Sequence, residues 1–142
     1  MQEYNKPLPE RDEDAELFWE AAGRHELVLY QCKICGDYAP LQFPIGGTGC
    51  LEHGDAKMEW GKVSGKGTVF TFVVFQMAFN PAFKDDVPYN VAMIELEEGP
   101  LLMSNVVGCK IEDLKIGMPV EVVFEDVSEG EALPKFRLAT GA

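Results

Sequence analysis

The sequence predicts a mainly β protein with a single helix near its N-terminus. Two observations support this fold class. Residues 61–142 carry five β-rich segments bounded by turn residues, whereas residues 1–25 carry one segment with helical spacing. Between them, residues 26–60 are rich in glycine and proline and contain two short cysteine and histidine pairs. We therefore expect three parts: an N-terminal arm and helix over 1–25, a region over 26–60 that contains both short pairs (the knuckled region, each pair with its turn being a knuckle), and a β domain over 61–142.

The helix is predicted after the acidic run at 12–14, because negative charge favours a helix N-terminus. Apolar residues then recur at helical spacing from Leu17 to Ala22, and Gly23 is a suitable end. The pattern predicts a helix of roughly ten residues. Two roles stay open for it: a lid on the protein's own core, or a docking element for another subunit.

The knuckled region is predicted to bind a metal ion. Its two pairs have the same spacing, and a glycine follows each pair: Cys32-Lys33-Ile34-Cys35-Gly36 and Cys50-Leu51-Glu52-His53-Gly54. A two-residue gap lets one tight turn aim both side chains at a single ion, and glycine supplies the positive φ needed to leave the turn. Four such ligands suit tetrahedral Zn²⁺. The alternative is three buried thiols and a surface histidine.

This zinc is expected to be structural. A catalytic zinc keeps three protein ligands and an open position, whereas Cys32, Cys35, Cys50 and His53 fill the shell. A deaminase-type site would need a His-x-Glu element, which neither histidine begins. We expect a rubredoxin-like zinc ribbon, with a short strand at 27–30 leading into the first knuckle.

Residues 61–142 are predicted to form a five-stranded Greek-key barrel of the OB type. Glycines at 65 and 67 suit the sharp bend of a long first strand. The predicted strands span 63–77, 89–96, 101–107, 120–127 and 136–139, with a helical turn at 111–114. A long loop at 78–88 carries Phe79 and Phe83, which either tuck onto the barrel or contact a partner or ligand.

Composition limits the function. The chain has 142 residues and a net charge of −12, with no lysine- or arginine-rich stripe, which disfavours nucleic-acid binding. No apolar run is long enough to span a membrane. Three cysteines assigned to metal leave Cys109 single, which fits a reducing cytoplasm.

Six segments together resemble, over nearly the whole chain, the zinc-ribbon/OB-fold proteins that accompany thiolase-like enzymes acting on acyl-CoA. They lie at 18–20 (Phe-Trp-Glu), 32–36, 64–72, 88–89, 116–120 and 133–137 (Leu-Pro-Lys-Phe-Arg). One departure is visible: His53 stands where this family commonly has a fourth cysteine. Imidazole can replace thiolate on zinc, so metal binding should survive the change.

The resemblance implies a non-catalytic subunit that binds a thiolase-like catalytic partner and helps to shape its acyl-CoA site. Its most specific form is the zinc-finger subunit of benzoylsuccinyl-CoA thiolase from anaerobic toluene degradation. No catalytic residue is expected in this chain. Two alternatives remain: a stand-alone cytoplasmic acyl-CoA enzyme using Cys109, and a single-stranded nucleic-acid binder.

If the chain is such a subunit, apolar groups outside the barrel core should contact the partner. The candidates are Leu17, Phe18, Trp19, Phe43, Phe79 and Phe83. Coenzyme A carries phosphates, so direct contacts would favour cations near the barrel entrance and its last strand. Those candidates are Lys62, Lys66, Lys135 and Arg137.

Overall fold

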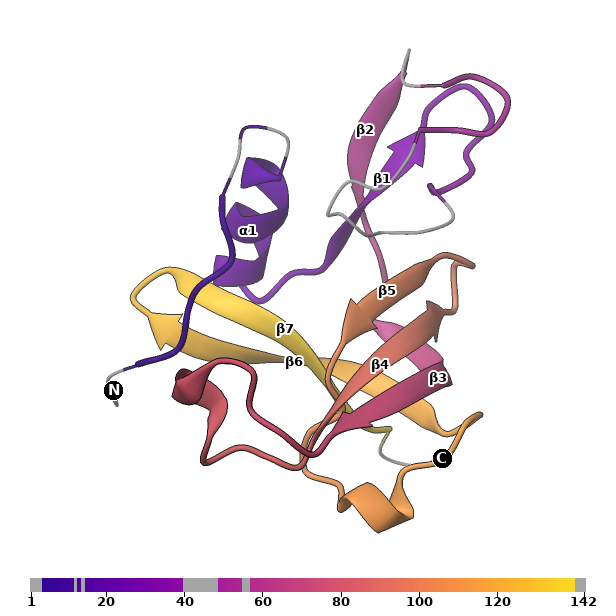
Figure 1. Cartoon of the computed structure of the whole chain (residues 1–142). Coiled ribbons are helices and arrows are strands. Elements are labelled where there is room, and N and C mark those ends of the chain that lie inside the picture. The colour runs from indigo at the N-terminus through magenta and orange to yellow at the C-terminus, as the bar shows by residue number, and fades with distance from the viewer. Residues whose placement is uncertain (1–3, 12, 14, 40–48, 55–56, 140–142) are drawn as a thin grey trace.

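The computed structural model describes residues 4–11, 13, 15–39, 49–54 and 57–139. This part of the chain contains one α-helix, two 3-10 helices and seven strands (Figure 1). Their bounds are α1 Glu16–Gly23, β1 Val28–Cys32, β2 Met58–Lys62, β3 Lys66–Phe75, η1 Pro81–Phe83, β4 Tyr89–Leu96, β5 Leu101–Ser104, η2 Ile111–Asp113, β6 Pro119–Ser128 and β7 Glu131–Leu138. The mainly β class predicted from the sequence is confirmed.

The N-terminal helix is confirmed but is shorter than predicted, with eight residues. Of the acidic run proposed to start it, residues 12 and 14 lie outside the described residues. The helix buries Phe18, Ala21 and Ala22 and packs chiefly on β7 (Figure 1). Gly23 allows this approach, because a Cβ there would stand 2.1 Å from the carbonyl oxygen of Gly130.

The predicted zinc ribbon contains a two-stranded antiparallel ladder. The first strand was predicted at 27–30 and lies at Val28–Cys32, paired with β2 from Val28 opposite Lys62 to Cys32 opposite Met58. Sequence reasoning missed β2, because its five residues include a glycine and two charged side chains and lack a long apolar run. β2 therefore crosses the domain boundary that the sequence predicts between residues 60 and 61.

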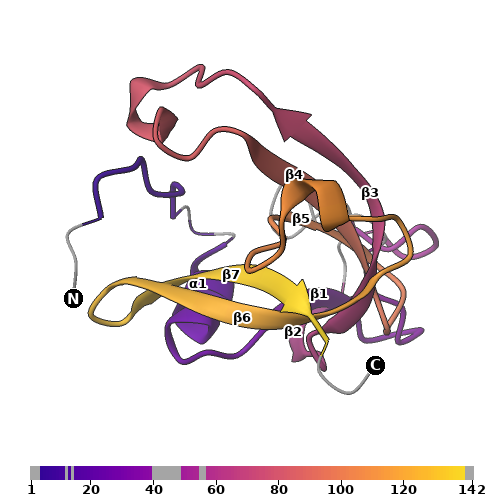
Figure 2. The same ribbon diagram turned by 90° about the horizontal axis from the view of Figure 1, so that it is seen from below.

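The five remaining strands form one curled antiparallel sheet in the order β5-β4-β3-β6-β7. A parallel bridge between Val106 and Phe136 brings the segment after β5 against β7, so the two edges of the sheet meet. Seen from below, the β6–β7 hairpin lies opposite β3 and β4 (Figure 2). This is the five-stranded OB arrangement predicted from the sequence.

The bounds of four of the five predicted barrel strands differ from the observed ones, and the start of β7 differs most. β7 begins at Glu131, five residues earlier than predicted. The prediction began too late because Pro134 lies in this segment and proline usually interrupts a strand. The Phe136 amide points away from β6 and donates to the Asn105 carbonyl at 2.9 Å. Two residues earlier, the nitrogen of Pro134 therefore faces the same edge, and its missing N–H costs no hydrogen bond to β6. β3 also contains a bulge between Val69 and Thr71. Gly67 allows close strand approach, since a Cβ would lie 2.4 Å from the Glu95 carbonyl oxygen.

One apolar core joins the helix, the ladder and the barrel. Its buried members are Phe18, Leu27, Leu29, Val63, Val69, Ala92, Ile94, Leu96, Leu102, Val106, Leu114, Val120 and Phe136. Leu29 of the ladder is fully buried in this cluster, so the ribbon and the barrel share a core. No helix in the described residues is long and apolar enough to cross a membrane.

Phe136 should be essential to this core. It is 0% exposed and lies on the strand that closes the barrel. We expect Phe136→Ala to lower the free energy of unfolding by about 3–5 kcal/mol in denaturant titrations, through lost burial and the cavity left behind. Leu138→Ala on the same strand, where the side chain is 42% exposed, should cost less than about 1 kcal/mol. Equal losses would contradict this core assignment.

Candidate functional site

The two knuckles have the same backbone hydrogen bond. The Gly36 amide donates to the Cys32 carbonyl at 2.9 Å, and the Gly54 amide donates to the Cys50 carbonyl at 2.8 Å. Both glycines have positive φ, 83° and 59°. No other atom lies near the place of a Cβ at either glycine, so backbone conformation, not space, requires glycine here.

The structure brings the four predicted metal ligands together. The three sulfurs and the His53 nitrogen all lie within 4.8 Å of one another. The Sγ atoms of Cys35 and Cys50 are 3.6 Å apart. His53 Nδ1 lies 3.5 Å from Cys50 Sγ and 3.7 Å from Cys32 Sγ. The chain segment between the knuckles, from 40 to 48, lies outside the described residues.

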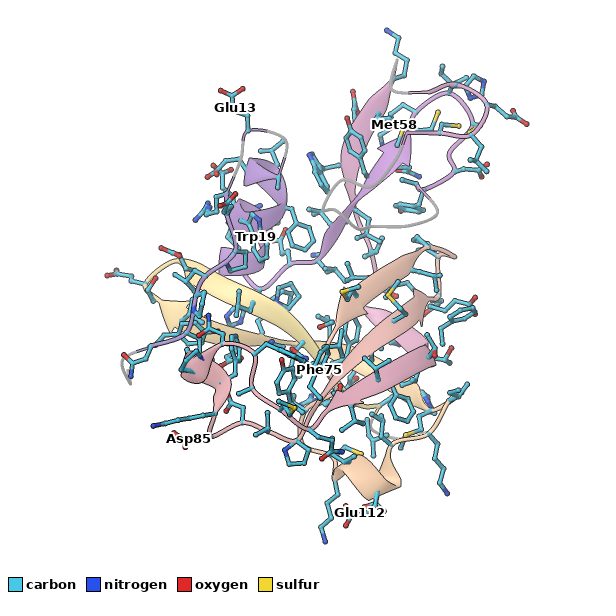
Figure 3. The ribbon with its side chains drawn as sticks, viewed as in Figure 1. Glu13, Trp19, Met58, Phe75, Asp85 and Glu112 are labelled. Carbon is cyan, nitrogen blue, oxygen red and sulfur yellow. The ribbon has the colours of Figure 1, made fainter. Side chains whose placement is uncertain are left out.

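These separations fit a tetrahedral ion. Zinc bonds of about 2.3 Å to sulfur and about 2.0 Å to nitrogen place neighbouring ligand atoms about 3.5–3.8 Å apart. Met58 at the start of β2 is the cross-strand partner of Cys32, so the ladder holds the first knuckle in place (Figure 3). The four residues could therefore hold a metal ion, and three thiolates with one imidazole suit zinc.

The pKa values of two neighbouring thiols shift in opposite directions. Backbone amides of His53 and Glu52 lower the pKa of the Cys50 thiol to about 6. The Asp37 amide also lowers the pKa of Cys35, but desolvation and the neighbouring sulfurs outweigh it and raise that pKa to about 11. Without a cation, one of two adjacent sulfurs keeps its proton. Metal binding releases that proton, since thiolates are the ligands.

The four cationic candidates for coenzyme A do not come together. Lys66 and Arg137 flank Glu121 in one row across β3, β6 and β7, and Arg137 Nε donates to Glu121 Oε1 at 3.0 Å. Lys62 ends β2, opposite Val28. Lys135 alone lies in a groove.

The apolar candidates for partner contact differ in how exposed their side chains are. Phe18 is 2% exposed and packs edge-on against Trp19 within the core region, so its ring offers no free surface. This burial fits the lid alternative for the helix. Leu17 is exposed on the same helix, and Phe79 is 79% exposed in the long loop. Phe83 is half-buried against Tyr89.

The two remaining residues singled out from the sequence are Phe43 and Cys109. Phe43 lies outside the described residues. Cys109 Sγ donates to the Lys110 carbonyl at 3.4 Å, and desolvation together with Asp113 raises the pKa of its thiol. A raised pKa makes the thiolate scarce, so this sulfur lacks the activation a nucleophile needs.

A groove of about 580 Å³ lies beside the barrel, between the β6–β7 hairpin, the start of β4 and the N-terminal arm. It is lined by Tyr4, Lys6, Phe83, Asp86, Tyr89, Asn90, Asn105, Val106, Val107, Val123, Phe124, Glu125 and Lys135. Sequence reasoning found only Phe83 and Lys135 among these. The available signal was Asn90, the one polar residue among the buried positions of β4, which are otherwise Ala92, Ile94 and Leu96.

A chain of polar contacts holds the groove's inner wall. Asn90 binds Val106 twice: its Nδ2 donates to the carbonyl and its Oδ1 accepts from the amide, both at 2.8 Å. Asn105 Nδ2 donates to the Asn90 carbonyl, and Lys135 Nζ donates to Asn105 Oδ1. Burial lowers the pKa of Lys135. The ammonium is therefore positioned by two asparagines that are themselves fixed.

Comparison with known proteins adds to this picture. Residues 60–125 match the family described as ChsH2, C-terminal OB-fold domain. A DUF35 domain-containing scaffold protein of Methanocaldococcus jannaschii is 39% identical over 75% of this chain and 72% of its own length. A probable enoyl-CoA hydratase alpha subunit of Thermomonospora curvata is 34% identical over 94% of this chain. This chain spans only 40% of that subunit's length.

A solved structure is also similar. It is titled Ltp2-ChsH2(DUF35) aldolase, and the matching chain has a TM-score of 0.77 and 31% identity, covering 92% of this chain and 98% of that one. The match therefore includes the helix and the ribbon as well as the barrel. The chain belongs to the ChsH2/DUF35 family of OB-fold scaffold proteins.

Proposed function

We propose that this chain is a non-catalytic, zinc-binding subunit of an acyl-CoA complex that makes or breaks carbon–carbon bonds. The observation that carries the proposal is the similarity along almost the whole chain to the ChsH2(DUF35) component of an aldolase structure. Relatives named as scaffold proteins, rather than as enzymes, support the same role.

The finer form of the proposal is a thiolase-like partner. It rests on the six sequence segments described above. Its most specific version, thiolysis of benzoylsuccinyl-CoA in anaerobic toluene degradation, rests on those segments alone. The thiolate ligands suit a reducing compartment, so we place the complex in the cytoplasm.

The metal is proposed to be zinc with a structural role. Four protein ligands leave no coordination position for water or substrate. Zinc at the end of the β1–β2 ladder would fix the ribbon's shape and supply no chemistry.

Contacts to coenzyme A are proposed for Lys62, Lys66, Lys135 and Arg137, and contacts to the partner for exposed apolar groups. Arg137 is already paired with Glu121, so it is the cation least available to a phosphate. Leu17 and Phe79 are the partner candidates whose side chains stand most exposed.

The zinc proposal predicts a simple stoichiometry. The purified chain should hold one zinc ion, measured by elemental analysis. Cys32→Ser should lose most of it, because Cys32 is fully buried at the centre of the site and a hydroxyl is a poor zinc ligand. Cys109→Ser removes a sulfur outside the site and should keep the full zinc content. Retention of zinc by Cys32→Ser would contradict the ligand set.

The interface proposal predicts a loss of binding without a loss of folding. Phe79→Ala should weaken the complex with the catalytic subunit at least about fivefold, measured by calorimetric titration, because about 1 kcal/mol is the loss that distinguishes an energetically important interface side chain. Ile116→Ala is the matched control, since Ile116 is 67% exposed but lies near η2, far along the chain from this loop. Unchanged affinity for Phe79→Ala would remove this ring from the interface.

The non-catalytic role predicts that turnover requires the partner. The purified chain alone should neither cleave nor form acyl-CoA carbon–carbon bonds in a coupled assay. Adding the thiolase- or aldolase-type subunit encoded in the same host should restore turnover, and Cys109→Ser should leave that activity unchanged. Turnover by the chain alone, abolished in Cys109→Ser, would establish the stand-alone enzyme instead.

A further inference from the structure

The groove beside the barrel contains a cation that lacks an ion-pair partner. Lys135 Nζ donates to Asn105 Oδ1, an uncharged acceptor. Within the described part of the chain, no carboxylate forms a salt bridge with this ammonium. Desolvated cations in proteins are normally paired, because their charge is costly to remove from water. An ammonium has three donors, so Lys135 can still bind an oxygen from a ligand.

Two of the three other charged residues that line the groove, Lys6 and Asp86, neutralise each other. Lys6 Nζ lies 2.8 Å from Asp86 Oδ2, and the hydrogen bond raises the pKa of Lys6. Lys6 also lies over the rings of Tyr4 and Phe83 at 5.7 and 6.0 Å from their centroids. This cation is therefore held by the N-terminal arm and the loop before β4, and it has little charge left to offer a ligand.

Glu125 sets the charge that the groove accepts. It lies on β6 two residues from Val123, which faces Lys135 across the ladder, so Glu125 is a diagonal neighbour of the lysine. Its charge raises the pKa of Lys135, although the two side chains form no salt bridge. Because Lys6 and Asp86 pair with each other, a ligand would meet one unpaired ammonium, Lys135, and one exposed carboxylate, Glu125. A doubly charged phosphate would leave more uncompensated negative charge there than a singly charged group. A single negative charge is the better match.

The rest of the groove is apolar and largely aromatic. Tyr89 is held between Phe75, stacked at 5.2 Å between centroids, and Phe83 at 5.9 Å. Phe75 lies at the centre of Figure 3, where β3 approaches the loop that carries Asp85. Val107 and Val123 complete the lining. Ring faces and valine methyls favour a flat apolar body, and 580 Å³ lies within the usual range for small-molecule sites.

We propose that this groove binds a small monocarboxylate with a flat, apolar body, and that its carboxylate binds Lys135 Nζ while its body lies against the edge of Tyr89 and the valine methyls. The site belongs to this chain alone and needs no residue of a catalytic partner. It is therefore independent of the proposed scaffold role, and either can fail without the other.

Three probes that share a phenylethyl body and differ in their polar group test the charge requirement on the full, zinc-loaded chain. They are 3-phenylpropionate, its amide, and 2-phenylethyl phosphate. Binding is measured by calorimetry and by NMR shifts of the Asn90 and Asn105 side-chain amides. We expect saturable binding of the carboxylate, with both amide signals shifted. The neutral amide and the phosphate should each bind at least about tenfold more weakly.

Three variants test the residues. Lys135→Met keeps the aliphatic stem and should weaken carboxylate binding at least about tenfold. Glu125→Gln removes a repelling charge without changing shape, and it should strengthen binding at least about threefold. Lys66→Met removes a lysine that does not line the groove and should leave the affinity unchanged.

Several results would overturn the proposal. These are no saturable binding of the carboxylate, equal or tighter binding of the phosphate or the amide, or full affinity in Lys135→Met. If Lys135→Met does not fold, Glu125→Gln decides alone: unchanged or weaker carboxylate binding in that variant refutes the assignment.

Discussion

Three sulfurs and an imidazole lie within 4.8 Å of one another, and this cluster could hold a metal ion between the two knuckles. Thiolates at this separation would repel each other, so the cluster needs a proton or a cation between its sulfurs. A bound metal ion would replace that repulsion with four metal–ligand bonds. It would thereby join the first knuckle, at the end of β1, to the second, which precedes β2.

The β1–β2 ladder is joined to the barrel by packing and by a backbone hydrogen bond. Leu29 lies in the β1–β2 ladder and is fully buried in the common core, and the Val63 amide donates to the Leu27 carbonyl at 3.0 Å just before β3 begins. The ribbon is therefore part of the barrel's packing rather than a separate attachment. A scaffold subunit benefits from this arrangement, because a rigid surface loses less conformational entropy when it binds a partner.

Much of the fold could be predicted because each element carries its own local signal. The strand at Tyr89–Leu96 was predicted with its observed bounds, since an apolar run lies there between two clear turns. The metal ligands were found because spacing and glycine act within five residues. β2 and the first half of β7 were missed because tertiary pairing, not propensity, makes strands of Met58–Lys62 and of the residues before Phe136. The groove was missed for the same reason: Asn90, Asn105 and Lys135 are far apart in sequence, and only barrel closure joins them.

The central claim is that this chain contributes structure around a saturated, chemically inert metal ion. X-ray absorption at the zinc edge of the purified protein tests it directly. The account predicts three sulfur neighbours at about 2.3 Å and one nitrogen at about 2.0 Å, unchanged when acyl-CoA is added. A spectrum with two or fewer sulfurs and an oxygen neighbour that acyl-CoA displaces would show an open, reactive site and would contradict the account.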